Sequence, residues 1–169
     1  MMNKERNIFS IINEYRKSIP VDLRGLLKEL GIDLMFSNLD NDISGIIESV
    51  GKTYRIIVNE SHSETRQRFT IAHELGHYVF HRNLIGNGIY DNKAYRCSYP
   101  NQYNNPNINS VHETEANKFA VSLLIPNDEL ERNKAITNHL ETHEQVRRLA
   151  EKFNVSKQAM AIRLDVNYP

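Results

Sequence analysis

Apolar and polar residues alternate with a helical period near the N-terminus of the chain. The apolar positions follow steps of three and four, as on one face of an α-helix: Ile8, Phe9, Ile11, Ile12 and Tyr15. This pattern predicts a helix that ends before Pro20. A second helix is expected over residues 22–30, because Gly31 follows it and glycine readily adopts the left-handed conformation of a helix cap.

Three short segments then have the composition of β-strands, with several β-branched or apolar residues in each. They are residues 32–36, 43–50 and 53–59. Gly51-Lys52 separates the last two segments, and a two-residue connection containing glycine predicts a β-hairpin. We therefore expect a small three-stranded sheet.

The clearest helical pattern begins near Ser61. Ser61 and Glu64 have the spacing of a capping box, in which a hydroxyl and a carboxylate satisfy backbone donors at a helix start. An apolar stripe follows without a proline before Arg82. Its members are Phe69, Ala72, Leu75, Gly76, Val79 and Phe80. We predict one long helix here, with this stripe packed against a core.

Another amphipathic helix is predicted over residues 112–126. The residues on its inward face are Glu113, Ala116, Asn117, Ala120 and Leu124. The two alanines on this face would allow another helix to approach closely. Ser110 and Glu113 also have the spacing of a capping box, so Glu113 could act only as a cap.

The C-terminal segment 146–164 has the pattern of two short helices, with Ser156 as the N-cap of the second. A further short helix is expected from Asn127. The helix-turn-helix-like pair could read DNA through Lys157, Gln158 and Arg163, or it could pack on the body or bind a protein partner. Nearby acidic residues dilute the positive charge, so we disfavour DNA binding. We divide the chain into a domain of residues 1–130 and a helical unit of residues 131–169.

The composition narrows the class of protein. The 169 residues carry 21 basic and 21 acidic side chains, so charge does not indicate a nucleic-acid partner. The N-terminus is amphipathic rather than uniformly apolar, and we expect neither an export signal nor a membrane span. A single cysteine, Cys97, fits a reducing compartment, so we expect a cytoplasmic protein.

Residues 82–110, between the two long helices, are rich in Asn and Tyr and show no clear period. Segments this long are usually functional or disordered. Two interpretations stay open for this segment, namely a lid over a cleft and a flexible insertion.

Candidate chemistry is concentrated in His73-Glu74-Leu75-Gly76-His77, on the first long helix. Residues four apart differ by about 40° around a helix, so His73 and His77 share one face and can bind one metal ion. Glu74 flanks this face without joining it, as a general base would. The pattern predicts a peptidase that uses Zn²⁺.

A catalytic zinc takes three protein ligands and keeps one position for water, so a third ligand is needed. His81 is excluded, because it lies about 12 Å from His73 along the helix axis. Glu113 is our choice from its helix face, and Glu115 is the alternative. Asn117, one turn after Glu113, can hydrogen-bond a metal-bound histidine.

Hydrolysis at such a site needs a base, an activated water and a donor for the developing oxyanion. Glu74 would take the proton of the water and deliver it to the leaving nitrogen. The residues do not decide among seven oxyanion donors: Tyr90, Tyr95, Tyr99, Tyr103, His112, His139 and His143. An extended substrate could add to the edge of the predicted sheet along residues 43–47.

Two blocks of this sequence resemble the ImmA/IrrE family of small metallopeptidases. The first block runs from Arg68 to His77, and the second reads Glu-x-x-Ala-Asn-x-Phe-Ala-x-x-Leu-Leu-x-Pro from Glu113. The resemblance implies a minimal zincin-like fold of the α+β class, mainly helical with a small three-stranded sheet. It also implies His73, His77 and Glu113 as zinc ligands, with Glu74 as the catalytic base.

The resemblance further implies a partner. Such proteins are typically encoded beside helix-turn-helix repressors on mobile elements or in stress regulons, and they inactivate these repressors by cleavage. The leading hypothesis is therefore a cytoplasmic zinc endopeptidase that cleaves a repressor. Two alternatives stay open: a non-catalytic zinc-binding regulator that binds a partner or DNA, and a toxin-antitoxin component. Closed structural zinc sites usually contain cysteine, and the motif has none nearby, which favours catalysis.

Overall fold

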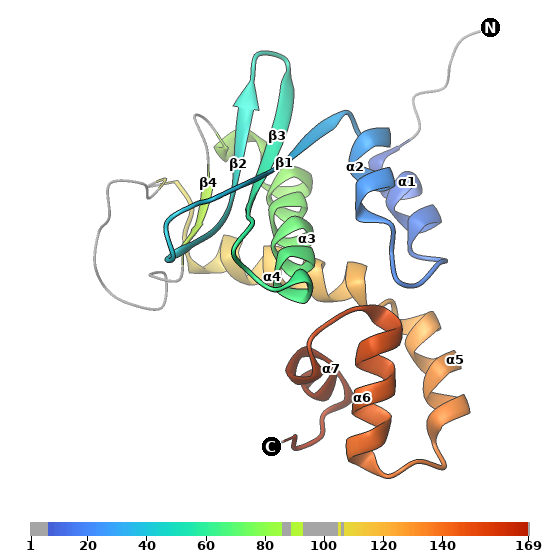
Figure 1. Cartoon of the computed structure of the whole chain (residues 1–169). Coiled ribbons are helices and arrows are strands. Elements are labelled where there is room, and N and C mark those ends of the chain that lie inside the picture. The colour runs from blue at the N-terminus through green and yellow to red at the C-terminus, as the bar shows by residue number, and fades with distance from the viewer. Residues whose placement is uncertain (1–6, 86–88, 93–104, 106, 169) are drawn as a thin grey trace, which may run out of the picture.

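The computed structural model describes residues 7–85, 89–92, 105 and 107–168 (Figure 1). These residues form a mainly helical fold with one small sheet, which confirms the α+β class. None of the helices within them is both long and apolar enough to cross a membrane. Tyr95, Tyr99 and Tyr103 lie outside the described residues, as does Cys97, and Tyr90 is described only by its place in a strand.

Two short helices open the fold. Helices α1 (Ile8–Tyr15) and α2 (Leu23–Glu29) match the two predicted N-terminal helices. The Asp22 carboxylate accepts a hydrogen bond of 2.9 Å from the Gly25 amide and so caps α2. Gly31 follows α2 with a φ of 69°, the left-handed conformation that we predicted for it.

The sheet has four strands in the order β1-β3-β2-β4. The three predicted strands are β1 (Ile32–Ser37), β2 (Ile43–Val50) and β3 (Thr53–Asn59). Strand β1 pairs in parallel with β3, and β2 and β3 form the expected antiparallel hairpin. A fourth strand, β4 (Ile89–Asn92), comes from the segment without a clear period and pairs antiparallel with β2.

Strand β4 changes the location of the sheet edge. It pairs with β2 from Ile43 to Ile47, so this part of β2 lies inside the sheet. The prediction that a substrate adds as a strand along residues 43–47 is therefore wrong, because β4 already occupies that edge.

Helix α3 (Glu64–Phe80) packs against β2 and β3, as Figure 1 shows. It begins after Ser63 rather than near Ser61, and the capping box that we predicted does not form. The Ser61 hydroxyl instead donates a hydrogen bond of 2.8 Å to Asn59 Oδ1 at the end of β3. A short 3-10 turn, η1 (Arg82–Leu84), follows the helix.

Helix α4 (Ser110–Leu124) packs across α3 (Figure 1). Its N-cap is Asn109, whose side chain accepts hydrogen bonds from the Val111 and His112 amides. In return, His112 Nδ1 accepts a hydrogen bond from the Asn109 amide, which completes a capping box. The capping role that we considered for Glu113 is therefore wrong, since Asn109 and His112 fill it.

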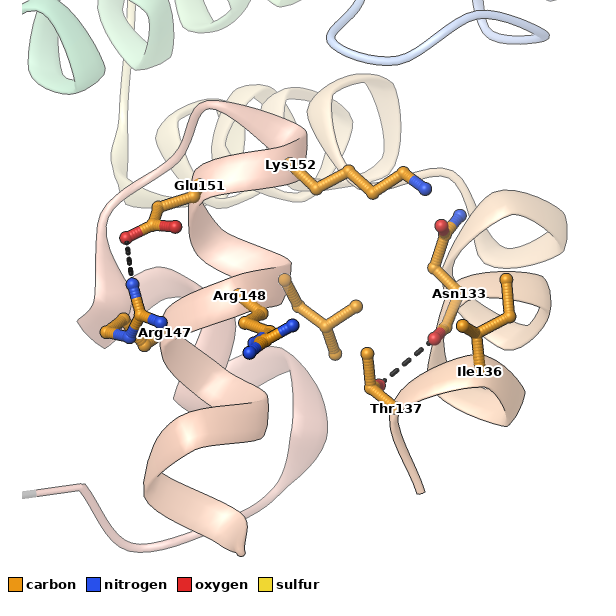
Figure 2. Close-up of a pocket in the computed structure, with 8 residues that line it drawn as sticks. Asn133, Ile136, Thr137, Arg147, Arg148, Glu151 and Lys152 are labelled. Atoms are coloured by element: carbon orange, nitrogen blue, oxygen red, sulfur yellow. Dashed lines mark hydrogen bonds and ion pairs between the residues drawn. The ribbon is translucent and has the colours of Figure 1, made fainter. Parts of the chain in front are cut away.

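Three helices follow α4, namely α5 (Asn127–Thr137), α6 (Thr142–Phe153) and α7 (Lys157–Leu164). Helices α6 and α7 are the predicted pair, joined through Asn154, which has a φ of 51°. The Ser156 hydroxyl accepts a hydrogen bond of 3.1 Å from the Ala159 amide and caps α7 as predicted. A pocket of about 490 Å³ lies between α5 and α6 (Figure 2). The division of the chain at residue 130 stays a prediction.

One hydrophobic core joins the sheet to helices from both parts of the chain. Its fully buried side chains include Ile47 of β2, Leu75 of α3, Leu123 of α4 and Phe153 of α6. Because α3 and α4 both contribute to this core, their relative position is fixed by packing on several sides.

Candidate metal centre

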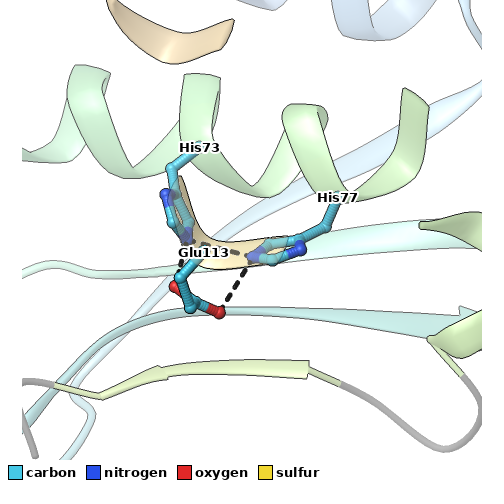
Figure 3. A group of neighbouring side chains, drawn as sticks. All are labelled: His73, His77 and Glu113. Atoms are coloured by element: carbon cyan, nitrogen blue, oxygen red, sulfur yellow. Dashed lines mark hydrogen bonds and ion pairs between the residues drawn. The ribbon is translucent and has the colours of Figure 1, made fainter. Parts of the chain in front are cut away.

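Helices α3 and α4 bring three side chains to one point, which we call the His-His-Glu cluster (His73, His77 and Glu113; Figure 3). His73 Nε2 and His77 Nε2 are 3.1 Å apart. Glu113 Oε2 lies 3.2 Å from His73 Nε2, and Glu113 Oε1 lies 3.3 Å from His77 Nε2. Among the described residues, no other group of histidine, cysteine and acidic side chains is arranged to hold a metal ion.

The spacing of these atoms fits a zinc ion. With bonds of about 2.0–2.2 Å, neighbouring ligand atoms of a tetrahedral zinc are about 3.3 Å apart. The separations of 3.1, 3.2 and 3.3 Å in the cluster, two of which involve different oxygens of Glu113, are close to this length. Two imidazoles and one carboxylate also form a known type of catalytic zinc site, in which the fourth position stays open.

Burial and hydrogen bonding set the charges of the cluster. His77 is fully buried, and this burial lowers its pKa, which favours the neutral imidazole that a metal requires. Burial acts to raise the pKa of Glu113, but hydrogen bonds with His73 and His77 outweigh it and hold the pKa at about 2. Near neutral pH, Glu113 is therefore a carboxylate and His77 is uncharged.

The second ring nitrogen of each histidine contacts a side chain outside the cluster. His73 Nδ1 lies 3.0 Å from Asn117 Oδ1, the contact that we predicted for Asn117. His77 Nδ1 lies 3.0 Å from His81 Nδ1, and His81 Nε2 lies 2.9 Å from Glu115 Oε2. These contacts hold both rings with Nε2 facing the centre of the cluster.

His81 and Glu115 have a place that the sequence analysis did not foresee. We excluded His81 as a ligand, and the structure places it behind His77. Glu115, the alternative third ligand, pairs with His81 and does not join the cluster. The spacing of four residues between His77 and His81 was a signal for this contact, since such pairs are neighbours on a helix.

A glycine in α3 allows α4 to approach. A Cβ atom at Gly76 would lie only 3.0 Å from Ala116 Cα and 3.2 Å from the Ala116 carbonyl oxygen. The backbone of α4 therefore packs directly on α3 beside His77, which brings Glu113 within reach of both histidines. Ala116 is fully buried at this contact, in agreement with the small residue that we expected there.

Glu74 lies beside the cluster on the face of α3 that meets β2. Its side chain is fully buried. A Cβ atom at Gly45 of β2 would lie 3.5 Å from Glu74 Oε1 and would overlap the Thr70 side chain. The glycine in β2 thus leaves room for the Glu74 carboxylate between α3 and the sheet.

The described candidates for an oxyanion donor are engaged elsewhere or are remote from the cluster. His112 caps α4 and packs against His81, with ring centroids 4.8 Å apart. His143 of α6 stacks on Tyr168 at 4.6 Å. His139 lies in the exposed connection between α5 and α6. The structure therefore supports none of these three as the donor.

A cleft of about 800 Å³ opens on the cluster. His73, Glu113 and Asn117 line one part of it, and it continues along α3 and α4 as far as α7. The cluster is therefore buried on one side and faces a cleft on the other, as a site for a large substrate requires.

A protein-family comparison covers most of the chain. Residues 27–165 match the model of a peptidase family that is described as the IrrE N-terminal-like domain. This range contains the His-His-Glu cluster, Glu74 and the whole sheet. The chain belongs to the IrrE-like family.

This IrrE-like chain also resembles individual proteins at low sequence identity. It is 26% identical over 116 residues to "Uncharacterized immunity region protein 2" of Bacillus phage phi105. This match covers 69% of this chain and 64% of the phage protein. The fold resembles a solved "Mycobacterium tuberculosis transcriptional regulator" with a TM-score of 0.60 and 17% identity, over 94% of this chain and 46% of that one. The chain thus spans less than two thirds of the phage protein and about half of the regulator, and the likeness to the regulator shows the fold alone.

Proposed function

We propose that this chain is a zinc-dependent endopeptidase that hydrolyses a peptide bond in a helix-turn-helix transcriptional repressor. The observation that carries the proposal is the convergence of two imidazoles and one carboxylate at the edge of a cleft, with their donor atoms 3.1–3.3 Å apart. The family and the immunity-region name of the phage relative support a repressor as the substrate. Cleavage would relieve repression of a mobile element or a stress regulon, in the cytoplasm where the repressor acts.

Each residue of the site has a role in this proposal. His73, His77 and Glu113 hold Zn²⁺, while Asn117 and His81 keep the two imidazoles oriented. A zinc ion held by these residues would supply Lewis-acid chemistry, which polarises a carbonyl and lowers the pKa of water. Glu74 accepts a proton from the attacking water and delivers it to the leaving nitrogen. Hydrolysis then needs no covalent bond between the protein and its substrate.

The test compares the wild type with Glu74→Gln in cells that also express the helix-turn-helix repressor encoded beside the gene. The amide keeps the size of the side chain but cannot accept the proton, so the repressor is cleaved by the wild type only. Elemental analysis of both purified proteins should find zinc at about one ion per chain, because position 74 is not a ligand. Glu60→Gln, the same change at an exposed carboxylate outside the cleft, should cleave like the wild type.

Two outcomes would contradict the proposal. Loss of the repressor with both the wild type and Glu74→Gln would show that another protease cleaves it. A repressor that stays intact with both proteins would show that the partner or the activity is misassigned.

A second candidate function is a regulator that binds DNA or a partner without catalysis. The helix pair α6 and α7 favours it, because the pair has the form of a DNA-binding motif. The charges of α6 count against it. Arg147 pairs with Glu151 at 2.7 Å, as Figure 2 shows. Arg147 and Arg148 each pair with Glu144 at 2.7 Å as well. Arginines neutralised in this way contribute little to phosphate binding.

A further inference from the structure

The cleft that opens on the His-His-Glu cluster extends well beyond it. Its other end reaches α7 and the residues just before it. Apolar side chains from α4 and from this C-terminal segment gather there: Val121, Leu124, Val155, Ala159 and Ile162. Leu124 and Val155 are buried, whereas Val121 and Ala159 are partly exposed. We call this group the apolar end of the cleft.

Helix α7 is held at this position by contacts with the first turns of α3. Arg68 Nε donates a hydrogen bond of 3.2 Å to the Asn154 carbonyl, and Asn154 Nδ2 donates one of 2.6 Å to Glu64 Oε1. Asn154 is the residue that joins α6 to α7, and Met160 anchors α7 in the core. The apolar end is therefore built on elements that are fixed relative to the metal-binding helix.

Ile162 is the feature of the apolar end that packing does not explain. It is 74% exposed, the most exposed large apolar side chain among the described residues. Exposed apolar side chains that line a cleft mark places where a ligand covers them. Because the cleft is continuous with the His-His-Glu cluster, the ligand that we consider here is the polypeptide that would enter the site.

The length of the cleft limits how far from the cleaved bond this contact can be. Glu64, where α3 meets the α6–α7 junction, is nine residues before His73, or about 13 Å along the helix axis. An extended polypeptide advances about 3.3 Å per residue, so it covers this distance with about four residues. The junction of α6 and α7, where Asn154 contacts Glu64, therefore lies about four substrate residues from the metal, and we expect the contact at the apolar end at about this distance.

We propose that the apolar end of the cleft is a specificity subsite of the peptidase. It takes one large aliphatic or aromatic side chain of the substrate, which packs between Ile162 and Ala159 of α7 and Val121 of α4. This inference rests on the proposed function of the His-His-Glu cluster. The C-terminal helix pair then selects the substrate, as one wall of the active-site cleft.

The contacts of Gln158 and Arg163, two polar residues of α7, favour a polypeptide ligand over DNA. Gln158 lines the cleft. Arg163 donates a hydrogen bond to the Asn127 side chain and is thereby engaged within the protein. Two of the three α7 residues that we considered for DNA contact, Gln158 and Arg163, thus line the cleft or contact α5.

The test measures which peptides the full-length, zinc-loaded protein cleaves in a synthetic library of 14-residue peptides, with cleavage sites read by mass spectrometry. For the wild type we expect Leu, Ile or Phe to be enriched roughly tenfold at one position within about four residues of the cleaved bond. Ile162→Asp should abolish this enrichment and favour Lys or Arg at the same position, and Ile162→Lys should favour Asp or Glu. Ile136→Asp is the matched control, because Ile136 is 66% exposed and lines the pocket between α5 and α6 instead.

A binding measurement separates this inference from the proposed hydrolysis. The same peptides are immobilised and probed with Glu74→Gln, alone and combined with Ile162→Asp or Ile136→Asp. If no peptide is cleaved but the apolar preference in binding depends on Ile162, the subsite stands and the hydrolysis does not. An apolar preference that is the same in all three proteins overturns the subsite, and so does displacement of bound peptide by random-sequence duplex DNA.

Discussion

At the scale of single residues, the two histidines of the cluster are supported by partners of different charge. His73 contacts the neutral amide of Asn117, whereas His77 contacts His81, which is itself paired with the Glu115 carboxylate. A carboxylate behind a histidine increases the basicity of the ring toward a metal. The two imidazoles are therefore oriented by different groups, an amide behind His73 and a histidine–carboxylate pair behind His77.

Removing the partner of His73 should weaken metal binding. Asn117→Ala leaves the ring free to rotate, and we expect the zinc affinity to fall by about 10- to 100-fold. Competition with a chromogenic chelator at neutral pH measures this change. Asn117→Asp keeps the accepting oxygen and should retain most of the affinity. Equal affinity for the wild type and Asn117→Ala would show that the contact does not orient the ligand.

The metal-free protein should become less stable as the pH falls. Burial lowers the pKa of His77, so the unfolded chain takes up a proton near its ordinary pKa of 6.5 while the folded protein does not. Glu113 stays ionised in the folded protein down to about pH 2, whereas its ordinary pKa is 4.5. This second difference contributes on the order of 3 kcal/mol, present above pH 4.5 and lost as the pH falls to about 2.

Urea unfolding in the presence of a chelator, at a series of pH values, measures both effects. The free energy of unfolding should decrease below pH 6.5 and again below pH 4.5. Glu113→Gln should remove the second decrease and keep the first. A stability that does not change from neutral pH to pH 4 would contradict the prediction for His77.

The residues of the candidate site differ in how far the sequence could predict them. His73 and His77 share one helix, so their spacing alone places them together. Glu113 could be chosen as the third ligand because the inward face of the second helix was clear from the sequence. In the structure its carboxylate lies beside the two histidines. The pairing of His81 with Glu115 depends on how α3 and α4 cross, which no spacing within one helix reveals. The roles of all these residues in catalysis stay proposals.

At the scale of elements, the site depends on the close packing of α3 on α4. Gly76→Ala places a Cβ atom against the backbone of Ala116, which cannot give way as a side chain would. We expect the overlap to cost about 1–3 kcal/mol, partly offset by a gain of up to about 1 kcal/mol in helix propensity. Chemical denaturation should show a lower free energy of unfolding, and zinc should bind more weakly because Glu113 moves away.

A graded series makes this prediction sharper. Gly76→Val should lower both stability and zinc affinity further than Gly76→Ala, since the larger side chain separates the helices more. Variants that are as stable as the wild type and bind zinc as tightly would show that α4 can shift without affecting the site.

Two predictions about the elements were wrong for the same physical reason. The spacing of Ser61 with Glu64, and of Ser110 with Glu113, indicated capping boxes that do not form. Asparagine side chains nearby offer better acceptors, Asn59 for the Ser61 hydroxyl and Asn109 for the start of α4. Strand β4 was missed because it has only four residues and is stabilised by its pairing with β2, a contact distant in the sequence.

At the scale of the whole molecule, a metal ion at the cluster would tie α3 to α4. An ion that binds the folded protein and not the unfolded chain raises the free energy of unfolding, by about 2.7 kcal/mol at 100 times its dissociation constant. We therefore expect the melting temperature to rise steadily with free zinc in buffered solutions. Glu113→Ala should lose this increase, and Mg²⁺ should not replace zinc because it prefers oxygen ligands. A melting temperature independent of zinc would argue against the site.

The overall class of the fold could be predicted, because apolar periods of 3.6 and of 2 distinguish helices from strands along the chain. The position of α7 at the end of the cleft could not be predicted from the sequence. It is set by Asn154, which contacts α3 through both its carbonyl and its side chain, and by the shared core. A pattern confined to residues 146–164 predicts the helix pair but not what it packs against.

The donors that meet at the cluster come from helices separated by the whole segment 81–109, and this separation has a consequence for the life of the protein in a cell. An ion that cross-links two distant segments of a chain stabilises the folded protein, so the amount of folded protein in the cell would depend on the supply of metal. When zinc is scarce, the metal-free protein would unfold more often, and quality-control proteases would degrade it faster. A shortage of zinc would then lower the activity of this protein in two ways, by removing the metal from its site and by shortening its lifetime.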